Sequence, residues 1–172
     1  LTGGRVVDPS QNLDAQMDVL IEKGKISGIG QNVYKPKADS RKSAARDINI
    51  IDVTATLVPP GLIDMHTHLR EPGFEYRETI QTGSEAGSAG GFTSVACMPN
   101  TNPINDTRSV TEYIKRKAAS CNLVNVYPIA SISTGSEGAS LSEFMDLKDA
   151  GAVAFSDDGK PVTNSALMRR AL

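Results

Sequence analysis

Four short apolar runs recur along the chain after residue 57, and each ends in polar residues. The runs cover residues 62–65, 92–98, 123–130 and 152–155. The polar residues that end them are His68, Asn100, Ser131 and Asp158. This spacing of about 30 residues is the length of one βα unit. Because the runs are apolar without alternation, they are typical of parallel strands that are buried on both faces.

Helical patterns separate the apolar runs. They cover residues 76–90, 107–120 and 142–150, and a further one begins near residue 164. Gly90 and Gly151 stand where such helices would end. The pattern therefore predicts about four βα units over residues 57–172. A doubly wound sheet and a (βα)8 barrel both accept this repeat, and in a barrel the chemistry collects at the C-terminal ends of the strands.

Residues 1–56 follow a different pattern, typical of a small β module. Strands are predicted at residues 5–7 and 47–53, and a hairpin joins residues 18–21 to 26–30 around a glycine-containing turn. The polar, basic stretch 34–46 predicts an exposed loop. No set of catalytic side chains occurs here, so we expect the chemistry to lie in residues 57–172.

Composition excludes several classes of function. The net charge is −2, and no basic run alternates with aromatic residues, which argues against a nucleic-acid partner. No apolar run approaches 18 residues, so no membrane span is expected. The two cysteines, Cys97 and Cys121, do not form a disulfide framework, and we expect a reducing, cytoplasmic setting.

The two histidines of the chain, His66 and His68, indicate a metal site. Side chains at positions i and i+2 of a strand point to the same face, so both imidazoles can reach one point. Zinc and similar metals take imidazole and carboxylate ligands, and a catalytic site keeps one position open. Two surface histidines placed by chance are the alternative, which the pairing on one face makes the weaker interpretation.

Three further features near the strand ends allow two interpretations each. Arg70 can bind a substrate carboxylate through its planar guanidinium, or form a surface ion pair with Glu71. Either Asp157 or Asp158 can supply a carboxylate ligand, or both belong to a solvated turn. Asn100 offers a donor and an acceptor, but from the residues alone a turn is the better interpretation.

At this point a resemblance becomes specific. Residues 60–73, PGLIDMHTHLREPG, resemble the metal-binding signature of the dihydroorotases in the amidohydrolase superfamily. Residues 90–93, GGFT, and 98–103, MPNTNP, resemble the second strand and loop of that family. Residues 154–159, AFSDDG, resemble the bacterial type I form. The resemblance spans the whole chain, and the motifs follow in the family's order.

The resemblance implies a fold and a site. Residues 1–56 would form a small β-sandwich module, part of a composite urease-like domain with its first strand partly missing. Residues 57–172 would form the first half of a (βα)8 TIM-type barrel. His66, His68 and Asp158 would bind zinc, as one or two ions. His68, Arg70 and Asn100 would contact the substrate.

The implied activity is dihydroorotase: zinc-dependent, reversible hydrolysis of L-dihydroorotate to N-carbamoyl-L-aspartate in pyrimidine biosynthesis. The family also needs two later histidines and a general acid/base aspartate, which we expect beyond residue 172. We therefore expect the 172-residue chain to be an N-terminal piece that is inactive alone. A homodimer and an aspartate carbamoyltransferase are the protein partners that the resemblance suggests.

Two other functions compete with this one. A hydantoinase or allantoinase shares the His-x-His strand and the β module, but Arg70 favours a substrate with a free carboxylate. A non-catalytic scaffold for aspartate carbamoyltransferase would have lost its metal ligands, whereas His66, His68 and Asp158 are all present. Comparing the turnover of dihydroorotate, hydantoin and allantoin separates a dihydroorotase from a hydantoinase or an allantoinase. Metal analysis tests the scaffold.

Overall fold

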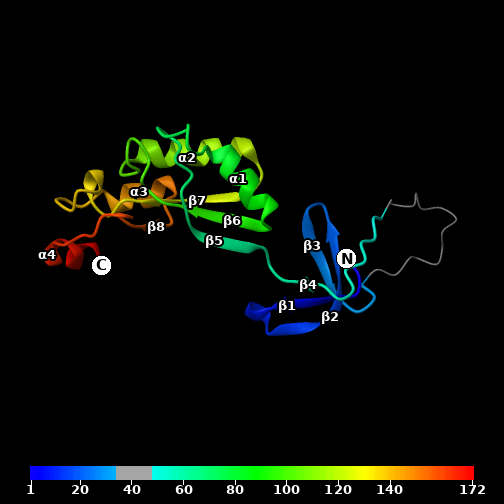
Figure 1. The fold of residues 1–172 in the computed structure, drawn as a ribbon. Coiled ribbons are helices and arrows are strands. Elements are labelled where there is room, and N and C mark those ends of the chain that lie inside the picture. Colours follow the sequence, from blue (N-terminus) through cyan, green and yellow to red (C-terminus); the bar gives the residue numbers. More distant parts are fainter. Residues whose placement is uncertain (34–47) are drawn as a thin grey trace. The chain divides into compact units, whose positions relative to one another are not determined.

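The computed structural model describes residues 1–33 and 48–172 and divides into two compact units, Leu1–Pro60 and Gly61–Leu172 (Figure 1). Each unit has its own sheet. The loop predicted over residues 34–46 lies outside the described residues.

The first unit is built on one four-stranded sheet in the order β3-β2-β1-β4. Its strands are β1 (Gly4–Asp8), β2 (Leu13–Glu22), β3 (Lys25–Gly30) and β4 (Leu57–Val58). The antiparallel pair β2-β3 confirms the predicted hairpin. Lys23 and Gly24 connect the two strands with φ values of 52° and 74°, and positive φ at both positions is what a type I′ hairpin turn requires.

Two features of this unit differ from the prediction. The prediction of a strand over residues 47–53 was wrong. Among the described residues of this segment, only Asp52 forms a bridge, with Thr2. A single bridge results because the segment touches the sheet only beside the start of β1. Strand β4 pairs in parallel with β1, so residues 57–58 belong to the first sheet. Within its described residues, 1–33 and 48–60, this unit contains one sheet.

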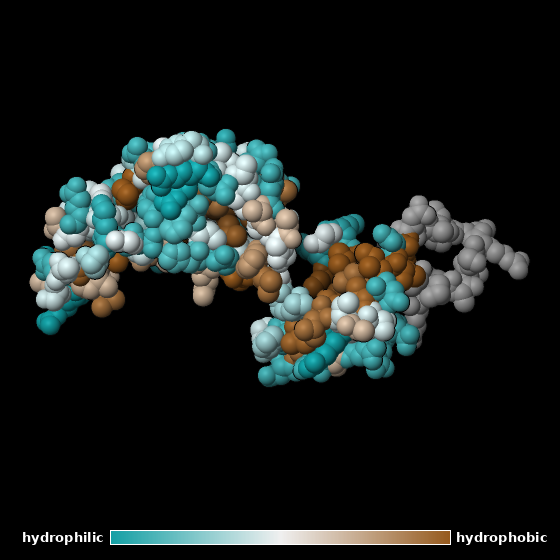
Figure 2. Space-filling model, in the orientation of Figure 1, coloured by the Kyte–Doolittle hydropathy of each residue, from teal (hydrophilic) through white to brown (hydrophobic). Residues whose placement is uncertain are grey.

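Apolar side chains gather on the visible face of the first unit (Figure 2). Among the described residues of this unit, the exposed large apolar ones are Ile21, Ile26, Ile29, Ile48, Ile50, Ile51 and Leu57. A patch of this kind is typical of surfaces that other protein segments cover.

The second unit contains a parallel sheet whose strands follow one another in chain order, β5-β6-β7-β8. They are β5 (Leu62–Thr67), β6 (Phe92–Cys97), β7 (Asn125–Ala130) and β8 (Ala154–Phe155). The helices are α1 (Ile80–Ala89), α2 (Arg108–Cys121), α3 (Phe144–Ala150) and α4 (Ser165–Ala171). A doubly wound sheet reverses its strand order and carries helices on both faces. Here the order does not reverse, and α1, α2 and α3 lie on one side of the sheet (Figure 1), so the unit is part of a (βα)8-type barrel.

Helix α1 begins later than predicted, at Ile80 instead of residue 76. Thr79 caps the helix: its hydroxyl accepts from the Thr82 amide at 3.0 Å, and the Thr82 hydroxyl accepts from the Thr79 amide at 3.1 Å. This reciprocal capping box defines the start of the helix more strongly than apolar periodicity does. In the described part of the chain, no helix has the length and apolarity that crossing a membrane requires.

The core of this unit lies between the sheet and the helices. Its buried apolar residues are Leu69, Ile80, Val95, Cys97, Val110, Ile114 and Ala118. A second cluster contains Ala96 of β6 and Met98, just beyond this strand, which pack with Ile129. The strands therefore contribute apolar side chains to both faces, as the uninterrupted apolar runs predict.

Replacing Ile114 with Ala is expected to lower the free energy of unfolding by about 2–5 kcal/mol, because the change leaves a cavity in a packed core. Ile114 is 1% exposed. Urea unfolding followed by circular dichroism measures the effect. Met145→Ala is the control, because Met145 is 71% exposed and should change stability by less than about 0.5 kcal/mol. Equal effects of the two substitutions would contradict this description of the core.

Candidate metal centre

The end of β5 presents the two histidines side by side. Two hydrogen bonds hold this end of the strand against β6: the Thr67 hydroxyl donates to the Ala96 carbonyl at 3.0 Å, and the Met98 amide donates to the Thr67 carbonyl at 2.8 Å. His66 and His68 lie on either side of Thr67, and their ring centroids are 5.2 Å apart. The two imidazoles thus lie close together where β5 ends.

Asp158 approaches both rings from the end of β8. Its Oδ1 lies 3.2 Å from Nε2 of His66, and its Oδ2 lies 3.7 Å from Nε2 of His68. One donor atom from each of the three residues can be chosen so that all lie within 4.8 Å of one another. Across residues 1–33 and 48–172, this is the one group of three or more side chains with the spacing of metal ligands. Two imidazole nitrogens and a carboxylate oxygen are a donor set that suits zinc.

Asn100 connects two members of this group. Its Nδ2 donates to Oδ2 of Asp158 at 2.8 Å, and its Oδ1 lies 3.0 Å from Nδ1 of His68. With Oδ1 as the acceptor, His68 carries its hydrogen on Nδ1, and Nε2 keeps a free lone pair directed at the carboxylate side. Metal-binding histidines are commonly oriented through the other ring nitrogen in this way. Sequence pattern alone favoured a simple turn residue at this position.

The two neighbouring aspartates face different partners. Asp157 is 5% exposed, and its carboxylate accepts hydrogen bonds from the amide and the hydroxyl of Ser133. Asp158 is the one beside the histidines. The residue pattern left this choice open and the resemblance selected Asp158, but neither indicated Ser133. The available signal was the serine-rich loop after the third apolar run, since the ends of neighbouring parallel strands lie together.

Arg70 lies in a tight turn just beyond His68. The Glu71 amide donates to the Leu69 carbonyl, so the turn closes around Arg70, whose φ is 53°. Positive φ in a residue other than glycine is uncommon, and such strain is frequent at binding sites. Among the described residues, the Arg70 guanidinium forms no hydrogen bond or ion pair. The alternative of a surface ion pair with Glu71 is therefore not what the structure contains.

Glu71 is buried instead and joins three elements. It is 4% exposed, and its carboxylate accepts from the Ile80 amide at the start of α1 and from the Tyr113 hydroxyl on α2, both at 2.8 Å. Lys117 lies 3.4 Å from the same carboxylate. These contacts hold the segment that carries Arg70 against the helices. The hydrogen bond to Glu71, aided by burial, raises the pKa of Tyr113 to about 12.

Replacing Glu71 with Gln is expected to lower the pKa of Tyr113 towards the ordinary tyrosine value of about 10. The negative carboxylate stabilises the protonated phenol, and a neutral amide does so less. Ultraviolet titration of the phenolate measures this, with Tyr113→Phe identifying the signal. Glu112→Gln is the control, because Glu112 pairs with Arg108. An unchanged Tyr113 titration in the Glu71 variant would show that this hydrogen bond does not set the pKa.

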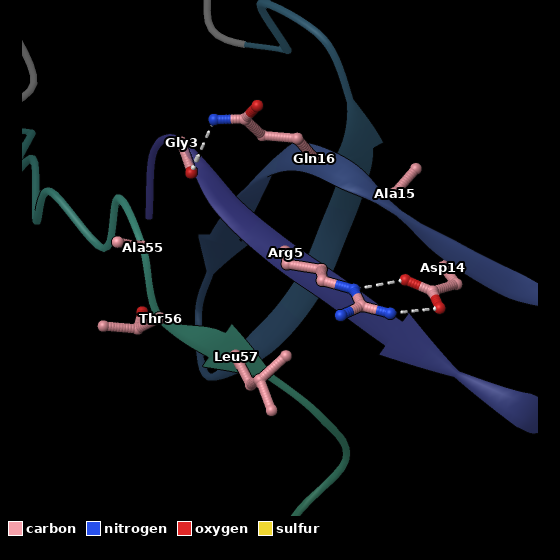
Figure 3. Close-up of a pocket in the computed structure, with 8 residues that line it drawn as sticks. All are labelled: Gly3, Arg5, Asp14, Ala15, Gln16, Ala55, Thr56 and Leu57. Atoms are coloured by element: carbon pink, nitrogen blue, oxygen red, sulfur yellow. Dashed lines mark hydrogen bonds and ion pairs between the residues drawn. The ribbon is translucent and has the colours of Figure 1, made fainter.

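Two surface pockets differ in their chemistry. One, of about 480 Å³, is lined in part by Ser156, Asp157, Asp158 and Lys160 and so borders the candidate centre. The other, of about 470 Å³, lies in the first unit (Figure 3). Its charged residues, Arg5 and Asp14, are paired through Nε–Oδ1 and Nη2–Oδ2 hydrogen bonds of 2.6 and 2.7 Å. Since these exposed groups satisfy each other, the second pocket offers no unpaired group for a reaction.

Known proteins resemble this chain in sequence and in structure. The model of a family described as dihydro-orotase-like matches residues 55–172. Proteins named dihydroorotase from Syntrophus aciditrophicus and Geobacter sulfurreducens are 60% and 54% identical over the 172 residues. The chain spans 38% of the length of each of these relatives.

Among solved structures, an L-hydantoinase (dihydropyrimidinase) from Arthrobacter aurescens superimposes with a TM-score of 0.62 and 21% identity. The match covers 90% of this chain and 31% of that one. A D-hydantoinase (dihydropyrimidinase) from a Thermus species gives 0.56 and 24%, covering 77% and 27%. At these identities the likeness concerns the fold, and it agrees with the barrel-type strand order.

Proposed function

Because the chain belongs to the dihydro-orotase-like family, we propose that the protein is a zinc-dependent dihydroorotase of pyrimidine biosynthesis. It would interconvert L-dihydroorotate and N-carbamoyl-L-aspartate. The observation that carries this proposal is the group formed by His66, His68 and Asp158, which come from the ends of two separate strands.

The donor set of this group fits zinc. Nε2 of each histidine and a carboxylate oxygen of Asp158 would hold the ion, and Asn100 would keep His68 in the tautomer that leaves Nε2 free. When bound, the ion supplies Lewis-acid chemistry, activating water and polarising a carbonyl group. Asp158, being 18% exposed in its side chain, provides the negative charge in a partly shielded position.

Arg70 would select the substrate. Its guanidinium has no partner among the described residues, and a planar guanidinium binds a carboxylate through two parallel hydrogen bonds. Dihydroorotate carries a carboxylate outside its ring. Asn100 would add a contact, because its amide nitrogen has a second hydrogen beyond the one given to Asp158. Hydantoin, lacking this carboxylate, would lose these interactions.

The test uses the protein expressed from its complete gene. We expect bound zinc, turnover of dihydroorotate that a chelator removes and added zinc restores, and much slower turnover of hydantoin and allantoin. Preference for hydantoin or allantoin would replace this proposal with another cyclic amidohydrolase. Absence of both metal and turnover would favour the non-catalytic scaffold.

Other aspects of the proposal concern setting and partners. We place the reaction in the cytoplasm, where the free thiols of Cys97 and Cys121 stay reduced. The homodimer and the aspartate carbamoyltransferase partner stay predictions, which size measurement of the purified protein with and without that enzyme would test.

A further inference from the structure

We propose that Asp157 is a positioning residue, which directs Asp158 towards the two histidines by holding the end of β8 against the loop after β7. The inference rests on the proposed function, because it assigns Asp157 a part in building the metal group. Asp157 would not touch the metal or the substrate itself.

The first step concerns the burial of the Asp157 carboxylate. Oδ1 accepts from the Ser133 amide at 3.0 Å, and Oδ2 accepts from the Ser133 hydroxyl at 2.5 Å. Ser133 is fully buried. Within residues 1–33 and 48–172, no lysine, arginine or histidine pairs with Asp157. Burying a carboxylate without a cation is costly unless its hydrogen bonds are well formed, so this contact allows little freedom of position.

The second step is that Ser133 is itself held firmly. Its hydroxyl accepts from the Gly138 amide at 2.8 Å, and its carbonyl accepts from the Ser136 amide at 2.9 Å. A bridge to Leu141 closes the loop behind it. Asp157 therefore binds a residue that hydrogen bonds within the loop already hold in place.

The third step is that β8 alone restrains Asp158 weakly. The strand has two residues, Ala154–Phe155, and after the Ser156 amide donates to the Ala130 carbonyl the backbone leaves the sheet. Asp157 accepts from Ser133, and its carbonyl accepts from the Lys160 amide, which closes a turn at Asp158. With Asp157 fixed on Ser133, Asp158 begins this turn at the place where its carboxylate meets His66 and His68.

The test compares metal binding by the protein from its complete gene and by its Asp157→Asn variant. An asparagine keeps one acceptor but places an NH2 group against a serine that already donates twice, so the contact loosens. We expect Co²⁺ to bind about 10–100-fold more weakly, as when an outer hydrogen-bond partner of a ligand is lost, and its visible spectrum to change. Ser133→Ala, which removes one of the two donors, should weaken binding less.

Asp106→Asn is the matched control. Asp106 accepts from the Gly135 amide of the same loop at 2.8 Å, but it does not adjoin a ligand, so Co²⁺ affinity and spectrum should stay as in the parent protein. Weaker binding confined to the Asp157 and Ser133 variants supports the proposal, and unchanged Co²⁺ affinity in both overturns it. If Asp157→Asn does not fold, unchanged affinity in Ser133→Ala alone overturns it. A parent protein that binds no Co²⁺ contradicts the proposed function itself.

Discussion

Replacing Asp158 with Asn is expected to reduce zinc affinity by more than the roughly 100-fold that loss of an outer hydrogen-bond partner costs. Among the described residues, the substitution removes the one carboxylate that lies beside both histidines and leaves only their two imidazole nitrogens from this group as donors. The amide can still accept from Asn100, so the local hydrogen bonding changes little. Isothermal titration of the protein from its complete gene with zinc measures the affinity, and the proposed turnover of dihydroorotate should fall with it.

The control for this prediction is Asp146→Asn. It removes the same charge from an exposed position, where Asp146 pairs with Arg108 at 2.6 Å. An exposed ion pair contributes about 0–1 kcal/mol to stability, so this variant should keep its fold and its zinc. Should Asp158→Asn bind zinc as tightly as Asp146→Asn does, the carboxylate of Asp158 is not a ligand.

The order of elements in the second unit follows from sequence because it depends on local pattern. Uninterrupted apolar runs of strand length alternate with amphipathic stretches, and only a parallel sheet with crossover helices accommodates that alternation. The resemblance then separated a barrel from a doubly wound sheet, and the chain-order sheet agrees with it. The β2-β3 hairpin was predictable for a similar reason, since its turn is set by Lys23 and Gly24.

Contacts between distant segments could not be read from pattern. The Asn100 amide reaches Asp158, 58 positions later in the chain, and only the meeting of strand ends brings them together. The same holds for Glu71, whose partners lie on α1 and α2. A charged residue beside an arginine suggests an ion pair, but burial against the helices gave Glu71 other partners.

The choice between Asp157 and Asp158 shows a further limit. Both residues are carboxylates beyond the end of the strand, so the residue pattern does not say which one faces the histidines. That depends on Ser133, which lies in a loop without a repeating pattern. The side chain directions at the centre were therefore set by packing of loops, whereas the residue types that gather there were already visible in the sequence.

Replacing Arg70 with Lys is expected to raise the KM for dihydroorotate while changing kcat less. Lysine keeps the charge but loses the planar pair of donors that fits a carboxylate. Hydrogen bonds to charged groups contribute about 1.5–3 kcal/mol, which corresponds to roughly 10–100-fold in affinity. Steady-state kinetics of the protein from its complete gene measure both constants. An effect on KM alone is the sign of an interaction made equally in substrate and transition state.

Arg77→Lys is the matched control for Arg70, because Arg77 lies in the same segment but stacks over the rings of Phe74 and Tyr76. It should leave KM unchanged, and both variants should keep their zinc. A second ligand makes the comparison more specific: a dihydroorotate derivative in which a neutral amide replaces the carboxylate. The parent protein should bind it more weakly than dihydroorotate, and the difference should shrink in Arg70→Lys. If the affinities for the two ligands differ by the same factor in the parent protein and in Arg70→Lys, Arg70 does not contact the carboxylate. Substrate selection must then come from another residue.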